Sequence, residues 1–195
     1  MENVTQLHPE STFAPGKIMA ERRPRIFLLG DMRAVGADSD NMLPQLRKSQ
    51  ALLAYLCLAD GQRLSRSRVA GVIWDGSAES HARESLRHAM FELQRLGWCP
   101  ERDHETIRLD VRDIWIDALG TPARPDLLLR SLHGLSPSFD GWVASERARY
   151  EERWHRDLRR ELEGRVAQKA PPDLRAESAR KLLNVVESDE GALLT

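Results

Sequence analysis

The feature that most constrains this chain is an uninterrupted apolar run over residues 51–58 (ALLAYLCL). We predict a helix over residues 48–59, ended by Gly61. A helix that is apolar on every side has to be covered by other elements almost completely. The sequence therefore predicts a buried central helix around which the rest of the domain packs.

The region before this helix has the pattern of a small antiparallel sheet. Residues 25–30 (RIFLLG) form a short apolar run that ends in glycine, which is typical of a strand. Gly36 and residues 38–41 (DSDN) supply turn residues before residues 42–46. We therefore expect the sheet to extend over residues 25–46.

Two further helices follow the apolar run. Residues 64–74 are predicted to form a short helix, and the hydroxyl of Ser65 is suited to cap its first turn. After the turn sequence Asp-Gly-Ser, a longer helix opens at Ser77 or Glu79 and continues to Leu96, where a glycine follows as its stop. Two helices joined by a tight turn that contains glycine are typical of a helix-turn-helix.

A β-hairpin is predicted next. Residues 106–109 and 113–117 each alternate partly between apolar and polar positions, and residues 110–112 lie between them. A hairpin directly after a helix-turn-helix would be the wing of a winged helix.

The proline-containing segment 121–125 is the expected domain boundary. We predict a mobile N-terminal arm over residues 1–24, a first domain over residues 25–120 and a helical domain over residues 121–195. The helices expected in that last part span residues 126–133, 140–167 and 177–186.

Composition and motifs narrow the function classes. The chain has 195 residues, 41% hydrophobic and 30% charged, with a net charge of −1, so any basic surface must be local. No apolar run is long enough to span a membrane, and no signal peptide is recognisable. Cys57 and Cys99 form no Cys-x-x-Cys pair and are expected to be free thiols in a reducing cytoplasm.

Motifs for catalysis or for a cofactor are missing from the sequence. His81 and His88 stand two helical turns apart, too far to share one metal ion. No nucleophile motif, P-loop or dinucleotide-binding motif is found. We therefore expect no enzyme, no cofactor and no metal.

The third helix carries the pattern that points to DNA. Its apolar stripe consists of Ala82, Leu86, Ala89, Leu93 and Leu96. The opposite side carries the candidates for reading bases, Ser80, Arg83, Glu84, Arg87, His88 and Phe91. An arginine fork can bond a guanine edge in the major groove, and a phenylalanine can contact a thymine methyl group. The alternative is an ordinary solvated face, in which Phe91 would pack under the wing.

Other basic residues are candidates for contacts with the DNA backbone. Phosphate contacts set the position of the protein, whereas base contacts set its sequence preference. The candidates for phosphate contacts are Arg47, Lys48, Arg63, Arg66, Arg95 and Arg108.

Residues 25–117 resemble the winged-helix domain of the SARP-type bacterial transcriptional activators, which is itself similar to the OmpR/PhoB class. The matching pieces are RIFLLG, RKSQALLAYLCLADGQRLSRSRVAGVIWDG, HARESLRHAMFELQRLG and IRLDVRDIWID. Two details depart from the family. Gln94 stands where an apolar residue is usual, and no proline lies between Trp74 and Asp75.

Residues 126–195 resemble the start of the bacterial transcriptional activation domain, through LLLRSLHGLSPSFDGWVASERARYEERW. The resemblance implies an α+β fold, a winged helix-turn-helix followed by an all-α, TPR-like domain. It further implies a regulator at the bacterial nucleoid that binds double-stranded DNA, on repeated sites as a possible homodimer, and activates transcription through RNA polymerase. The alternative is a protein-interaction adaptor whose winged helix no longer binds DNA.

Overall fold

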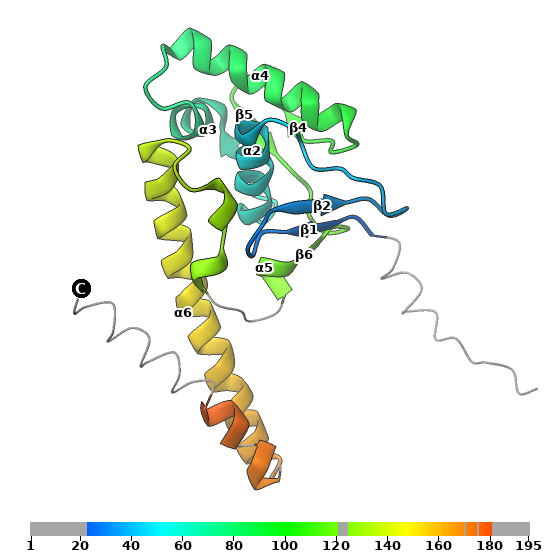
Figure 1. Ribbon diagram of the computed structural model, residues 1–195, viewed down its shortest axis with the longest axis vertical. Coiled ribbons are helices and arrows are strands. Elements are labelled where there is room, and N and C mark those ends of the chain that lie inside the picture. Colours follow the sequence, from blue (N-terminus) through cyan, green and yellow to red (C-terminus); the bar gives the residue numbers. More distant parts are fainter. Residues whose placement is uncertain (1–22, 121–124, 170, 175, 181–195) are drawn as a thin grey trace, which may run out of the picture.

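The computed structural model describes residues 23–120, 125–169, 171–174 and 176–180, and these form a mixed α and β structure (Figure 1). The predicted N-terminal arm lies almost wholly outside the described residues, as do residues 121–124 of the expected boundary. Two three-stranded sheets and a group of helices surround one hydrophobic core.

The central helix is α2, Arg47–Leu58, and its burial is as the sequence predicted. Every residue from Ala51 to Cys57 is buried, and Gly61 follows with a φ of 74°. Helices α3, Arg66–Ile73, and α4, Glu79–Arg95, pack against it and against each other. The apolar stripe of α4 supplies the contacts of that helix with the core.

The predicted cap of the second helix is confirmed. The Ser65 hydroxyl accepts a hydrogen bond from the amide of Arg68 at 3.5 Å. The helix begins later than predicted, because β3, Leu64–Ser65, pairs with β5, Thr106–Arg108. Strand β4, Glu101–Arg102, completes this sheet on the other side of β5.

The prediction that residues 106–109 and 113–117 form a hairpin is wrong. The hairpin consists of β4 and β5, whose turn is built by Asp103: its Oδ1 accepts from the amides of Glu105 and Thr106. Residues 113–117 instead contribute β6, Trp115–Ile116, which pairs parallel with β1, Arg25–Phe27. There Ile116 is buried beside Ile26, and this burial decides where the segment goes.

The first sheet is smaller than predicted. Strand β1 pairs antiparallel with β2, Arg33–Val35, and a single bridge from Val35 to Asn41 extends it. Residues 42–46 form no strand, since Pro44 has no amide hydrogen to donate to a neighbouring strand. The short helix α5, Asp117–Gly120, follows β6, and the Asp117 carboxylate accepts from the amides of Leu28 and Leu29.

The predicted helix over residues 126–133 is two single 3-10 turns, η1, Pro125–Leu127, and η2, Arg130–Leu132. Between them the chain runs beside the end of β1. The amide of Gly30 donates to Leu127 O at 2.7 Å, and the amide of Leu129 donates to Leu28 O at 2.8 Å. These two hydrogen bonds pair residues 127–129 with the end of β1, so the predicted helix is interrupted there.

The long helix α6, Pro137–Ala167, begins three residues earlier than predicted. Ser136 caps it by accepting from the amide of Phe139 at 3.2 Å. Its first half packs beside α2 and α3, and its second half projects away from them (Figure 1). The core contains Leu128, Phe139 and Tyr150, so it is continuous across the expected domain boundary.

After α6 the chain turns back in a second helical segment. Arg165 at the end of α6 donates to Leu174 O at 2.7 Å, and the buried Ser178 bonds to Glu161 at 3.4 Å. Of the helix predicted over residues 177–186, residues 177–180 are helical and the remainder lies outside the described part.

We predict that Ser136→Ala lowers the free energy of unfolding by about 1–2 kcal/mol, because it removes a helix cap. The same hydroxyl also donates to Val72 O on α3 at 2.9 Å. Thermal unfolding should show a melting temperature lower by roughly 2–8 °C. The matched control is Ser145→Ala on the exposed side of α6, whose hydroxyl bonds only within that helix. An equal loss in both variants would contradict the role of Ser136.

Candidate nucleic-acid interface

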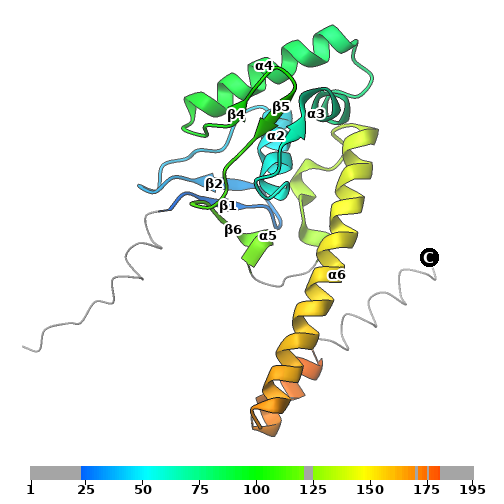
Figure 2. The ribbon, with the colours of Figure 1, turned by 180° about the vertical axis from the view of Figure 1, so that it is seen from behind.

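The outer face of α4 is exposed along its whole length. In both ribbon views α4 lies at one edge of the molecule, with the other helices on one side of it only (Figures 1 and 2). Its stripe Ala82, Leu86, Ala89 and Leu93 is buried, whereas Leu96 is half-buried. All the predicted base-reading side chains lie on the other side, exposed except for the half-buried Glu84.

Phe91 does not pack under the hairpin. It is 60% exposed, which is unusual for a large aromatic side chain on a helix that buries its other apolar residues. The alternative in which this residue is covered by the hairpin is therefore excluded. Its ring is available for contact with another molecule.

The arginines of the exposed face are held by neighbouring carboxylates. Arg83 pairs with Glu79, and Arg87 pairs with Glu84, which also contacts His88 Nε2 at 2.9 Å. The third glutamate of the helix, Glu92, accepts from the amide of Gln45 before α2. These are exposed pairs, which contribute little to stability and exchange partners readily.

Arg63 and Arg66 lie beside the turn of the hairpin. Arg63 contacts Glu101 at 3.6 Å and Asp103 at 3.4 Å, and Arg66 donates to Asp103 O at 2.9 Å. A groove of about 470 Å³ runs from here to α4. Its lining residues are Ser65, Arg66, Ser67, Arg83, Leu86, His104 and Glu105. The fold thus brings two predicted contact residues, Arg66 and Arg83, to one groove.

The other predicted backbone contacts are placed differently. Arg47 donates to the carbonyls of Ser131 and His133, at 3.4 and 2.9 Å, and so fixes η2 against α2. Lys48 lies 6.0 Å from the Trp74 ring centroid, at the end of α3. Both lie at the start of α2, away from the face of α4, and their contact with a DNA backbone stays a prediction.

Arg95 and Arg108 complete the predicted set. Arg95 is exposed in the last turn of α4 and makes no ion pair with any residue that the structure describes. Arg108 is half-buried on β5 and pairs with Glu101 at 2.6 Å, while its Nε atom is buried without a partner in the same part of the chain. Arg95 is therefore the freer of the two cations.

The turn of the hairpin carries negative charge. Residues 101–105 contain Glu101, Asp103 and Glu105 against a single arginine, Arg102. The hydroxyl of Thr106 and the amides of Thr106 and Glu105 donate to Asp103 and lower the pKa of its carboxyl to about 2. The turn is therefore anionic at neutral pH, so an anion such as DNA would have to approach the hairpin along its arginines.

His104 and Ser67 were missed by the sequence reasoning. Both line the groove between the hairpin and α4. Ser67 is an exposed residue of α3, and only the correct assignment of β4 and β5 brings His104 to this place. The sequence held no local signal for His104.

None of the helices in the described ranges is long and apolar enough to cross a membrane. Likewise, no group of three or more His, Cys, Asp or Glu side chains suited to a metal ion occurs among those residues. Cys57 and Cys99 are free thiols, and burial raises the pKa of the Cys57 thiol.

No family model matches the chain, and no curated protein matches it.

We predict that Thr106→Val raises the pKa of Asp103 from about 2 toward 3.8, because the largest cause of its lowering is the hydrogen bond from the Thr106 hydroxyl. The folded-state pKa lies below the unfolded one, so this stabilisation is present above about pH 4 and is lost as the pH falls toward 2. An NMR titration of the carboxyl carbon measures the shift. Thr106→Ser keeps the hydroxyl and should keep the low pKa; equal values in the two variants would refute this cause.

Proposed function

We propose that the chain is a sequence-specific transcription regulator that binds double-stranded DNA. The observation that carries the proposal is the exposed face of α4, on which arginines, a histidine and Phe91 lie together and which no described residue covers. Helix α3, the turn, α4 and the β4–β5 hairpin follow in the order of a winged helix-turn-helix. In such a motif the second helix enters the major groove.

The chemistry of the face fits a base edge. Arg83, Arg87 and Phe91 succeed one another by a turn each along α4, so together they would span neighbouring base pairs. Arginine can bond both acceptors of guanine, and a phenylalanine ring can contact the thymine methyl group. His88, Ser80 and Glu84 add donors and acceptors at the same surface.

The phosphate contacts proposed here come from Arg63, Arg66 and Arg95. Arg66 lines the groove beside α4, Arg63 lies beside the hairpin turn, and Arg95 has no carboxylate partner among the described residues. The pairs Arg83–Glu79 and Arg87–Glu84 would open on binding. The glutamates then help to reject sequences that offer their arginines no acceptor, since an arginine without a base partner keeps its carboxylate.

The finer parts of the proposal rest on the resemblance to SARP-type activators. They are activation through RNA polymerase at the bacterial nucleoid, binding as a homodimer to repeated sites, and a TPR-like continuation of the helical region. The helical pair of α6 and residues 171–180 is compatible with the first part of such an array.

The second candidate is protein docking on the same face. It is favoured by the balanced charge of α4, whose arginines 83, 87 and 95 are matched in number by glutamates 79, 84 and 92, and by the acidic hairpin turn. DNA carries a dense negative charge, so an interface without excess cations binds it less strongly than a basic one.

We predict that Arg87→Ala weakens binding to a DNA site selected from a random library by roughly 1–3 kcal/mol and relaxes the preference at one or two positions. Affinities for single-base variants of that site, at fixed salt, measure both effects. Arg159→Ala on the exposed side of α6 is the control and should change neither. Equal weakening on every variant site would assign Arg87 to the backbone. If Arg83, Arg87 and Phe91 can all be replaced without loss, α4 does not enter the groove and protein docking becomes the better proposal.

We predict that Arg66→Gln reduces the slope of log K against log salt by about one unit, since one phosphate contact is lost. Arg47→Gln should leave that slope unchanged, because Arg47 is engaged by the carbonyls of η2. It should instead lower the free energy of unfolding by about 1–2 kcal/mol. Affinities over a range of salt concentrations, together with thermal unfolding, separate the two roles. If instead Arg47→Gln reduced the salt slope and Arg66→Gln lowered only the stability, the roles given to the two arginines would be overturned.

A further inference from the structure

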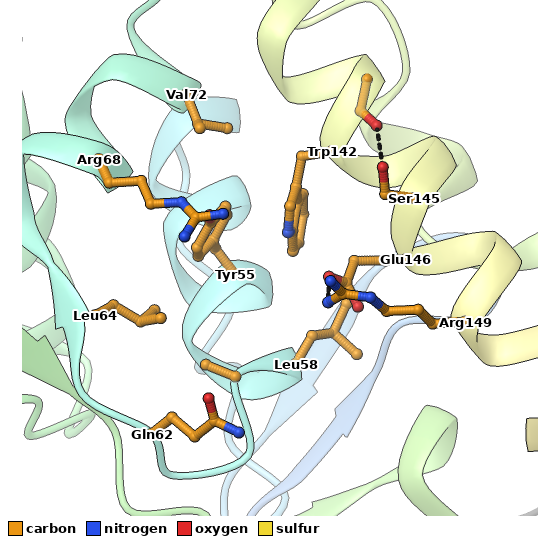
Figure 3. A pocket seen from close by; sticks show the side chains of 12 residues that line it. Tyr55, Leu58, Gln62, Leu64, Arg68, Val72, Trp142, Ser145, Glu146 and Arg149 are labelled. Atoms are coloured by element: carbon orange, nitrogen blue, oxygen red, sulfur yellow. Dashed lines mark hydrogen bonds and ion pairs between the residues drawn. The ribbon is translucent and has the colours of Figure 1, made fainter.

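A cleft of about 470 Å³ lies where α2, α3 and α6 meet (Figure 3). Its size falls within the range of small-molecule sites, about 300–1,000 Å³. Its walls come from the end of α2, residues 62–64, the outer side of α3 and the first half of α6. None of the residues proposed above to contact DNA lines it, so the inference drawn here is independent of that function.

The back of the cleft is aromatic. Tyr55 of α2 and Trp142 of α6 are stacked, with ring centroids 4.2 Å apart and planes 24° from parallel. Tyr55 is buried and Trp142 is half-buried, so the indole supplies the accessible part of this wall. Burial raises the pKa of the Tyr55 phenol, which therefore stays neutral and adds no negative charge.

Two donors line the cleft beside the aromatic pair. Arg68 reaches from α3 to Tyr55, with whose side chain it forms a hydrogen bond, and Trp142 contributes an indole N–H from α6 (Figure 3). Guanidinium and indole N–H groups donate hydrogen bonds and accept none. Together they suit a ligand group that only accepts, such as a carboxylate.

The charges of the cleft favour an anion. The half-buried Glu146 is already paired with Arg149, whose Nη1 lies 2.9 Å from its Oε1. Among the described residues Arg68 makes no ion pair, and its side-chain hydrogen bond is with the uncharged Tyr55. The cleft therefore holds one positive charge that no carboxylate of the described part neutralises.

Gly141 leaves the cleft open without serving the packing of α6. A Cβ atom added there would meet no atom within 4 Å. Glycine inside a helix costs about 1 kcal/mol relative to alanine, and neither steric crowding nor a positive φ requires it at this position. Because Gly141 lines the cleft, we expect a longer side chain at this position to occupy part of it.

We propose that the cleft binds a small organic carboxylate with a compact apolar body. The carboxylate accepts hydrogen bonds from the Arg68 guanidinium and the Trp142 indole. The apolar body lies against Leu58, Leu64 and Val72, which line the same cleft. Because these groups come from α2, α3 and α6, the bound ligand would link α3 to α6.

Benzoate is the probe, and benzamide, which has the same shape without the charge, is its control. The full chain labelled with ¹⁵N is titrated with each, and the signals of the Trp142 indole and the Arg68 Nε are followed by NMR. Benzoate should move both signals with a Kd of the order of 1 mM, as expected for a ligand of this size. Benzamide should bind at least about tenfold more weakly, because it lacks a charge-assisted hydrogen bond.

Two variants test the location. Gly141→Leu fills the cleft and should abolish the benzoate shifts, whereas Gly164→Leu, at an equally open position farther along α6, should leave them unchanged. Arg68→Gln should weaken benzoate by about tenfold or more while the melting temperature stays close to that of the parent. The proposal is overturned if benzoate causes no shifts, if benzamide binds as well, or if binding survives both Gly141→Leu and Arg68→Gln.

Discussion

The structure depends on the burial of α2. A helix that is apolar on every side is stable in water only when other elements cover all of it, and each such side chain contributes about 1.5–3 kcal/mol on burial. Helices α3 and α4 cover part of its surface, and the first half of α6 covers more, through the stacking of Trp142 on Tyr55. The helical region after residue 125 is therefore part of the same core. The burial of α2 against α6 therefore fixes the position of this region. A linker alone would leave that position undetermined.

The elements that the sequence predicts well are those with a local pattern. Helices have a period that a single segment reveals, and Gly61 and Ser65 mark their ends through local chemistry, so α2, α3, α4 and α6 were predicted within a few residues. Strands of two or three residues carry no such period. Segment 115–116 joins β1 because Ile116 is buried there beside Ile26, and this pairing involves residues that are about ninety positions apart. No reading of neighbouring residues could have found it.

The candidate site divides in the same way. The face of α4 and the place of Arg87 and Phe91 on it follow from helical periodicity, whereas the structure was needed to show that the hairpin leaves Phe91 exposed. The hydrogen-bond partners of these side chains could not be predicted from the sequence. Arg47 looks like a phosphate contact by charge, yet it donates to carbonyls of a segment more than eighty residues away. His104 reaches the groove only because Asp103 turns the hairpin there. Side chains that act through tertiary contacts are hidden from a pattern that records only charge and spacing.

The cationic side chains on the outer surfaces of α3 and α4 differ in whether a carboxylate is paired with them. On α4, Arg83 and Arg87 are held by glutamates of the same helix, so a partner must offer each arginine more than its carboxylate does. Such a face would discriminate among partners better than it attracts them, because an arginine that meets an ill-matched partner keeps its carboxylate. In the cleft, Arg68 pairs with no carboxylate of the described residues and lies beside an aromatic wall. There the unpaired positive charge would attract an anion, and the dimensions of the cleft would limit the size of that anion. Helix α3 thus lies between the surface that we propose selects DNA and the cleft that we propose holds a small carboxylate.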